Sequence, residues 1–186
     1  MRKSVLIFIA ASLISVLAQP AFSADADNQQ LKLAEEADQS DRKKPEAEID
    51  WIVLNARDEA RRKQVLAWLQ QGKIVTANDF YNAAMIYQHG DNVADYRIAN
   101  ALATVSMTLN PENKHAKWLY AASWDRLLMN SGKPQWFGTQ YRFNPKTERF
   151  ELYAVDLDAV SDQQREEFNV PDLKKAKEME KRFNQD

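Results

Sequence analysis

The sequence of 186 residues contains no cysteine. This absence excludes disulfide bonds, thiol nucleophiles, thiolate metal ligands and a lipid anchor on an N-terminal cysteine. Histidine is also scarce, with His89 and His115 only, and His115 stands in a charged segment where we expect it to be solvated. A metal site would need His89 together with carboxylates, so we expect neither a metal nor another cofactor.

Three common catalytic motifs are missing as well. The chain has no Gly-x-Ser-x-Gly elbow, no glycine-rich phosphate loop and no His-Glu-x-x-His zinc motif. It also lacks an excess of positive charge, since the formal net charge is -2 and both signs are interspersed. We therefore expect no nucleic acid among its partners.

The N-terminus has the pattern of a secretory signal peptide. Arg2 and Lys3 precede an apolar run that Pro20 breaks, and small residues follow at Ala21 and Ser23. We predict a signal peptide over residues 1–23; the alternative is an uncleaved anchor, for which the apolar run is short. The predicted mature chain has a net charge of -4, is periplasmic or secreted in a bacterium, and has no stable membrane insertion after cleavage.

Residues 24–46 are polar and charged, and Pro45 stands near their end. We predict a flexible leader or a loosely held helix over 24–46, followed by one domain over 47–186. The length of the chain also favours one domain.

The fold class follows from the spacing of apolar residues. The spacing predicts helices over 48–71, 77–89, 93–109, 112–131, 162–168 and 171–182, most of these limits being approximate. The helix over 112–131 is apolar on nearly every face, which is typical of a central, buried helix. Alternation on both sides of a turn at 144–147 predicts a β-hairpin over about 137–155. The expected fold is mainly α: about six helices around the central helix, with a small β-hairpin.

The helix over 48–71 carries a run of charges. Apolar residues such as Ile52 and Val53 fit one face, and the charges fall mostly on the other. We predict that this run is a solvated face, as such patterns usually are. Its members are Arg57, Asp58, Arg61, Arg62 and Lys63.

Asp125 and Arg126 interrupt the buried helix. Buried charges are costly unless they are paired, so both residues need partners. Neighbours on a helix point about 100° apart, so the two need separate sets of partners. We expect the segment 135–140 to supply one set and the helix end at His89 to supply the other.

These residues give three hypotheses for function. The first is a polar cluster that binds a small or peptidic ligand, with Arg126 holding an anionic group and with Gln135, Thr139 and Gln140 as further donors and acceptors. The second is a hydrolase-type enzyme with His89 as general acid or base, oriented by Asp91 or by a catalytic Asp125. In the third the domain is structural or binds a partner, with no small-molecule site. There His89 only caps its helix and the Asp125–Arg126 pair ties the hairpin to the core.

The segments Gln88-His89-Gly90-Asp91, Asp125-Arg126 and 135–140 together resemble an uncharacterised bacterial family, a domain of unknown function. That family is marked by a Gln-His-Ala-Asp-like step, an Asp-Arg pair in a helix and a Gln-x-Tyr-Gly-Thr-Gln segment. Its closing arginine and Leu-Pro helix are similar to Arg165 and Val170-Pro171, so the resemblance covers about 56–173. The chain differs at Gly90, where alanine is usual, and at Phe137, where tyrosine is usual. The resemblance implies a helical domain with a hairpin and no established activity.

Overall fold

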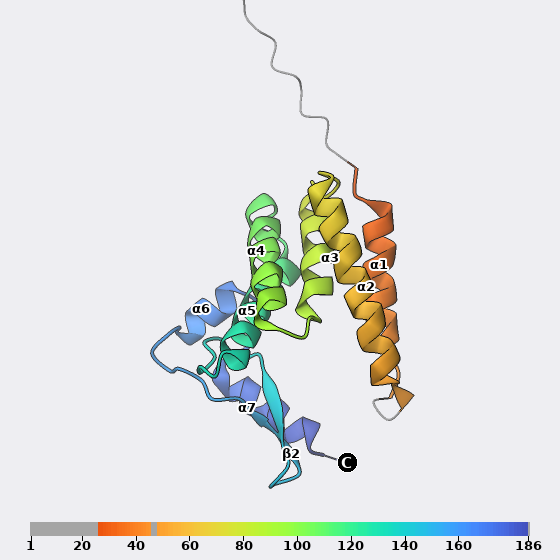
Figure 1. Cartoon of the computed structure of the whole chain (residues 1–186). Coiled ribbons are helices and arrows are strands. Elements are labelled where there is room, and N and C mark those ends of the chain that lie inside the picture. Colours follow the sequence, from red (N-terminus) through yellow and green to blue (C-terminus); the bar gives the residue numbers. More distant parts are fainter. Residues whose placement is uncertain (1–25, 46–47, 186) are drawn as a thin grey trace, which may run out of the picture.

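The computed structural model describes residues 26–45 and 48–185, and the predicted signal peptide lies outside them. The described chain forms seven helices and one two-stranded antiparallel sheet (Figure 1). The elements are α1 (Gln29–Asp41), α2 (Trp51–Gln70), α3 (Ala77–Gln88), α4 (Val93–Leu109), α5 (Lys114–Asn130), β1 (Tyr141–Asn144), β2 (Arg149–Leu152), α6 (Asp162–Glu167) and α7 (Leu173–Phe183). The predicted fold class, mainly α with a small hairpin, is confirmed.

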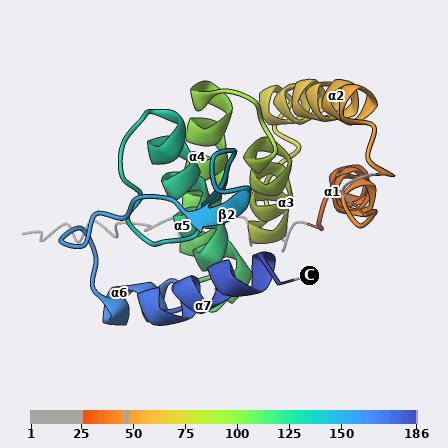
Figure 2. The ribbon, with the colours of Figure 1, turned by 90° about the horizontal axis from the view of Figure 1, so that it is seen from below.

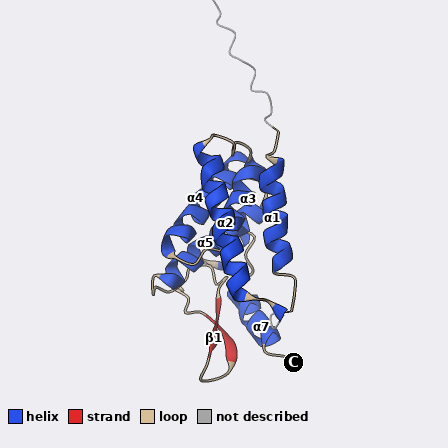
Figure 3. Cartoon of the chain, turned by 45° about the vertical axis from the view of Figure 1, so that its right-hand side comes forward, coloured by secondary structure: helices blue, strands red, loops and turns tan. Residues whose placement is uncertain are grey.

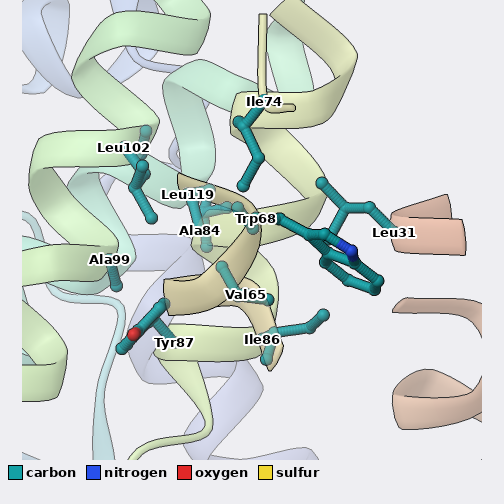
Figure 4. Close-up of a cluster of buried hydrophobic side chains, with 12 residues drawn as sticks. Leu31, Val65, Trp68, Ile74, Ala84, Ile86, Tyr87, Ala99, Leu102 and Leu119 are labelled. Carbon is teal, nitrogen blue, oxygen red and sulfur yellow. The ribbon is translucent and has the colours of Figure 1, made fainter. Parts of the chain in front are cut away.

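Helices α1 to α5 pack side by side around the main hydrophobic core. Figure 4 shows part of this core, in which Leu31 of α1, Trp68 of α2 and Leu119 of α5 are all buried. Helix α3 packs on α4, and α4 packs on α5. Burial of Leu119, Ala121 and Ala122 agrees with the central position expected for α5.

Of the two alternatives predicted for 24–46, a flexible leader or a loosely held helix, the structure has a helix, and this helix is firmly packed. Helix α1 occupies most of that range and packs against α3. Its sequence is polar, yet it buries Leu31 completely in the core and also buries the carboxylate of Asp38. The backbone N–H of Asn28 donates to Asp79 at the start of α3, with a distance of 2.7 Å between the nitrogen and Oδ1. The side chains of Leu31 and Asp38 on α1 and of Asp79 on α3 therefore join α1 to the domain.

The predicted solvated face of α2 is partly buried. Asp58 and Arg62 are inside the protein, whereas Ile52 is 85% exposed. Asp58 binds Arg42 beside α1 and Arg61 of its own helix, and Arg62 binds Asp95 of α4 with 3.1 Å between Nε and Oδ2. Ion pairs to neighbouring helices satisfy Asp58 and Arg62, whereas Arg57 and Lys63 of the same predicted face are exposed as expected.

The predicted hairpin is present with short strands. Tyr141 of β1 pairs with Leu152 of β2, and Asn144 pairs with Arg149. An isolated hairpin is marginally stable, and here α7 covers it. The N–H of Leu152 donates to Glu180, and the hydroxyl of Tyr141 donates to the carbonyl of Ala176. Hairpin and α7 form a unit at one end of the helical bundle (Figures 2 and 3).

Candidate functional site

Asp125 holds the loop that connects α5 to the hairpin. Its side chain is fully buried, and its two oxygens accept four hydrogen bonds. The N–H groups of Trp136 and Phe137 lie 2.8 and 2.9 Å from Oδ1, and Thr139 donates its N–H and its hydroxyl to Oδ2 at 3.0 and 2.8 Å. The prediction that segment 135–140 supplies the partners of Asp125 is confirmed.

The ionisation of Asp125 reflects two opposing effects. Burial raises the pKa of this carboxyl above its ordinary value, and the hydrogen bonds from Phe137, Thr139 and Trp136 act in the lowering direction. Aromatic side chains of a second hydrophobic cluster, Phe137 and Trp136 among them, shield the same loop. Asp125 accepts four hydrogen bonds from one loop, so its contacts are those of a residue that anchors the loop. Among the hydrogen bonds of the described residues, none joins Asp125 to His89.

Arg165 binds main-chain carbonyl groups of the same loop. This arginine of α6 is 2% exposed, and its guanidinium donates to the carbonyls of Phe137 and Trp136 at 3.1 and 2.8 Å. In the sequence, Arg165 stands out only through the family resemblance. The signal for a buried arginine was weak, because the surrounding segment of α6 is otherwise polar.

Gln135 and Gln140 shape the base of the hairpin. The amide of Gln135 is fully buried, donates to the carbonyls of Gln140 and Tyr153, and accepts the N–H of Gln140 at 2.8 Å. The amide of Gln140 donates to the carbonyl of Ala122 and presents its oxygen to Arg126. Both glutamines are thus fixed, and Gln140 aligns the guanidinium.

Arg126 lies between the hairpin and the end of α3. Its Nε donates to Oε1 of Gln140 at 3.0 Å, and its Nη1 donates to the carbonyl of Gln88 at 2.7 Å. The helix end at His89 provides one partner as predicted, the carbonyl of Gln88, but the other, Gln140, belongs to the segment 135–140 that also binds Asp125. Burial lowers the pKa of the Arg126 guanidinium. Within the described residues, Nη2 makes no hydrogen bond and no carboxylate pairs with Arg126.

His89 is the C-cap of α3, and its imidazole has a different partner from those predicted. Its Nδ1 lies 2.7 Å from Oδ2 of Asp38 on α1, so the expectation of Asp91 or Asp125 as its partner is wrong. Asp91 instead binds Arg62. Sequence reasoning missed Asp38 because it fell in the supposed leader. Asp38 also forms an ion pair with Arg42 and accepts a hydrogen bond from the side-chain amide of Gln39. The imidazole of His89 is therefore part of a larger polar network.

A cleft of about 630 Å³ brings several of these side chains together. Of the six predicted site residues, His89, Arg126, Thr139 and Gln140 line it, and Asp125 and Gln135 lie behind its wall. The remaining lining residues are Gln39, Met85, Gln88, Trp118, Tyr141, Phe150 and Phe183. They come from α1, α3, α5, both strands and α7.

Aromatic side chains form the part of the cleft that sequence reasoning did not anticipate. Trp118, Phe150 and Phe183 are 37%, 36% and 50% exposed, and the rings of Tyr141 and Phe183 meet edge to face at 4.9 Å between centroids. Alternation along the hairpin identified Tyr141 and Phe150 as strand positions only, and Trp118 and Phe183 fall in helices. Their common location depends on how α7 packs on β2.

Gln88 is a further feature that the sequence did not single out as a site. The residue is 4% exposed and lines the cleft, yet its Oε1 is buried without a hydrogen-bond partner. Buried polar atoms are nearly always satisfied, so an unpaired amide beside a cleft is unusual.

Two features are absent from the described residues. Among residues 26–45 and 48–185, no group of three or more histidine, aspartate or glutamate side chains is arranged to hold a metal ion. In the same residues, no helix is long and apolar enough to cross a membrane.

Comparison with protein-family models, with curated proteins and with solved structures finds no match to this chain. The resemblance to a bacterial domain of unknown function therefore stays a hypothesis, and a function has to be inferred from the geometry of the cleft.

Proposed function

We propose that this domain binds a small or peptidic ligand in the cleft through a carboxylate group, with Arg126 as the anion receptor. The observation that carries this proposal is a partly buried guanidinium that lines the cleft, has no carboxylate partner among the described residues, and has its Nη2 outside the hydrogen bonds of those residues. A guanidinium matches the two oxygens of a carboxylate in geometry and charge.

The other shielded arginines behave differently. Arg61 binds Asp41 and Asp58, Arg62 binds Asp95, and Arg165 binds Asp162. Arg126 instead has two neutral carbonyl acceptors, so its positive charge is solvated by dipoles and is not neutralised. A buried charge without a counter-charge is costly, and an anionic ligand offsets that cost.

The dimensions and rigidity of the site support the same proposal. A volume of about 630 Å³ lies within the range of roughly 300–1,000 Å³ that is typical of small-molecule sites. Gln140 and the carbonyl of Gln88 fix the guanidinium at two of its nitrogens, so little side-chain entropy is lost when a ligand binds.

A matched pair of probes tests this role by isothermal titration calorimetry. We expect 3-phenylpropanoate to bind and 3-phenylpropanamide, which is neutral and of the same shape, to bind at least tenfold more weakly. Arg126→Gln should remove the preference for the acid over the amide. Arg126→Lys should weaken this preference, and it provides the test if Arg126→Gln does not fold. Arg142→Gln is the control, since Arg142 is exposed on β1 and does not line the cleft. Equal binding of acid and amide by the native protein overturns the proposal.

The location of the protein is part of the proposal. The pattern of Arg2, Lys3, the apolar run and Ser23 supports export to the periplasm or the exterior. Cell fractionation followed by intact-mass measurement tests it: the mature chain should start near residue 24 and appear outside the cytoplasm. A full-length chain that stays in the cytoplasm contradicts it.

A second candidate function is proton transfer by His89. Asp38 binds Nδ1, which leaves Nε2 as the free nitrogen of an imidazole that lines the cleft. A carboxylate-oriented imidazole is the arrangement used in general acid–base catalysis. Mass spectrometry of a carboxylate ligand incubated with the protein tests this: a product that forms with the native chain and disappears with His89→Gln supports catalysis. An unchanged ligand supports binding alone.

A further inference from the structure

We infer that the preferred ligand is an N-acylated α-amino acid with an apolar side chain, the chemistry found at the C-terminal end of a peptide. This inference rests on the proposed carboxylate site and adds two recognition elements to it. They are the unpaired amide of Gln88 and the aromatic wall formed by Trp118, Phe150 and Phe183.

Gln88 supplies the first element. Its side-chain amide makes no hydrogen bond within the described residues, and its Oε1 is buried. Leaving such a group unsatisfied costs free energy that a ligand amide recovers, because an amide N–H donates to the oxygen. A carboxylic acid without an adjacent amide offers no such donor. The site is therefore built for a ligand that carries both groups.

The amide and the carboxylate receptor are neighbours. Arg126 donates to the backbone carbonyl of Gln88 itself, at 2.7 Å, so the free Nη2 and the free amide belong to two directly bonded residues. In an N-acylated α-amino acid, the carboxylate and the amide nitrogen are attached to the same carbon. One ligand carbon therefore carries a partner for each of these two residues, which both line the cleft.

The aromatic wall supplies the second of the two recognition elements. Tyr141 follows Gln140, the residue that aligns Arg126, and its ring packs against Phe183. Phe183 in turn lies 6.4 Å from Phe150 between ring centroids, and half of its surface is exposed. An apolar side chain on the same ligand carbon covers these rings, and such coverage is favourable because apolar surface leaves water.

Calorimetric titration with four defined probes tests the inference. N-acetyl-L-phenylalanine should bind most tightly. We expect roughly tenfold weaker binding for 3-phenylpropanoate, which lacks the amide, and for N-acetylglycine, which lacks the ring. The amide of N-acetyl-L-phenylalanine, which lacks the carboxylate, should bind weakest. A tetrapeptide with a C-terminal phenylalanine tests whether the natural ligand is the C-terminal end of a peptide. If it is, the tetrapeptide should bind at least as tightly as N-acetyl-L-phenylalanine.

Two variants assign the contacts. Gln88→Leu should bind N-acetyl-L-phenylalanine and 3-phenylpropanoate equally, and Gln88→Met provides the same test if the leucine variant unfolds. Phe183→Ala should lose the preference for phenylalanine over glycine. Met179→Ala is its control, because Met179 is 40% exposed on the same helix and does not line the cleft.

The results separate this inference from the proposed function. If 3-phenylpropanoate binds as tightly as N-acetyl-L-phenylalanine, the amide contact is overturned and the carboxylate site still stands. If N-acetyl-L-phenylalanine and its amide bind equally, the carboxylate site itself fails. Unchanged probe preferences in Gln88→Leu overturn the assignment of the amide contact to Gln88, and unchanged preferences in Phe183→Ala overturn the assignment of the aromatic wall.

Discussion

Asp125 and Arg165 hold the same dipeptide from opposite sides. Asp125 accepts the N–H groups of Trp136 and Phe137, and Arg165 donates to the carbonyls of the same two residues. The two side chains thereby satisfy four main-chain groups of a loop that has no strand or helix partner there. Gln140 lies three residues after Phe137 in the same loop. Asp125 and Arg165 therefore also help to position Gln140, the residue that aligns Arg126.

Substitution of Asp125 should therefore destabilise the whole domain. Asp125→Asn keeps one oxygen and turns an amino group toward two of the four donors. Each buried donor left without an acceptor costs about 1–3 kcal/mol, so we expect a loss of about 2–5 kcal/mol. Thermal unfolding followed by circular dichroism should show a Tm lower by about 10 °C. Asp158→Asn, at an exposed position, is the control, and equal melting of the two variants contradicts the anchoring role.

Helix α1 provides an internal pair of leucines for a second prediction. Leu31 is fully buried and Leu33 is 62% exposed on the same helix. Leu31→Ala should cost about 2–5 kcal/mol, because a cavity replaces core contacts, and Leu33→Ala should cost less than about 0.5 kcal/mol. Urea unfolding measures both. Similar small effects from the two substitutions would show that α1 is not part of the cooperative unit.

A third prediction concerns acid. The hydrogen bond from Arg61 holds the pKa of Asp41 below its ordinary value. A carboxyl with a lowered folded-state pKa stabilises the fold above its unfolded-state pKa, and that contribution is lost as the pH falls through the folded-state value. Because Asp41 is only partly shielded, we expect a contribution of about 1 kcal/mol. Asp41→Asn should lose that stability at neutral pH and show a smaller decline on acidification; an unchanged pH profile in urea unfolding counts against this.

Gly90 gives a fourth prediction. A Cβ atom at this position would lie 2.2 Å from the Cβ of Asp95, whose carboxylate binds Arg62. Gly90→Ala should destabilise the domain by about 3 kcal/mol, since the clash involves atoms next to the backbone. Gly132→Ala is the comparison: that site has open space and a φ of +71°, so its cost is backbone strain alone, about 1 kcal/mol. Urea unfolding of the two variants checks this order.

The sequence predicted the elements whose local signals agree with their packing. The limits of α4 match the prediction, Val93 to Leu109, and α3 begins at the predicted residue 77, where Thr76 and Asp79 form a capping box. The prediction failed where charge replaced hydrophobicity as the packing force. Asp38, Asp58 and Arg62 are buried because ion pairs across helices satisfy them, and no periodicity of apolar residues reveals such pairs.

The site was predictable in part for the same reason. Asp125 and Arg126 stood out because they interrupt an apolar helix, and their partners followed from proximity in the chain and from the angle of about 100° between neighbours. The pairing of His89 with Asp38 joins residues far apart in sequence, and so does the meeting of Trp118 with Phe183 at one cleft. Such pairings depend on tertiary packing, which a single sequence does not show.

The cleft takes Gln39 from the first described helix and Phe183 from the last residue of the final one. Its binding surface is therefore completed only when both ends of the domain are in place. A nascent chain that has not released α7 lacks one wall, and so does a proteolytic fragment without it. Under the proposed function, affinity for a carboxylate ligand should therefore report whether both α1 and α7 are folded onto the domain.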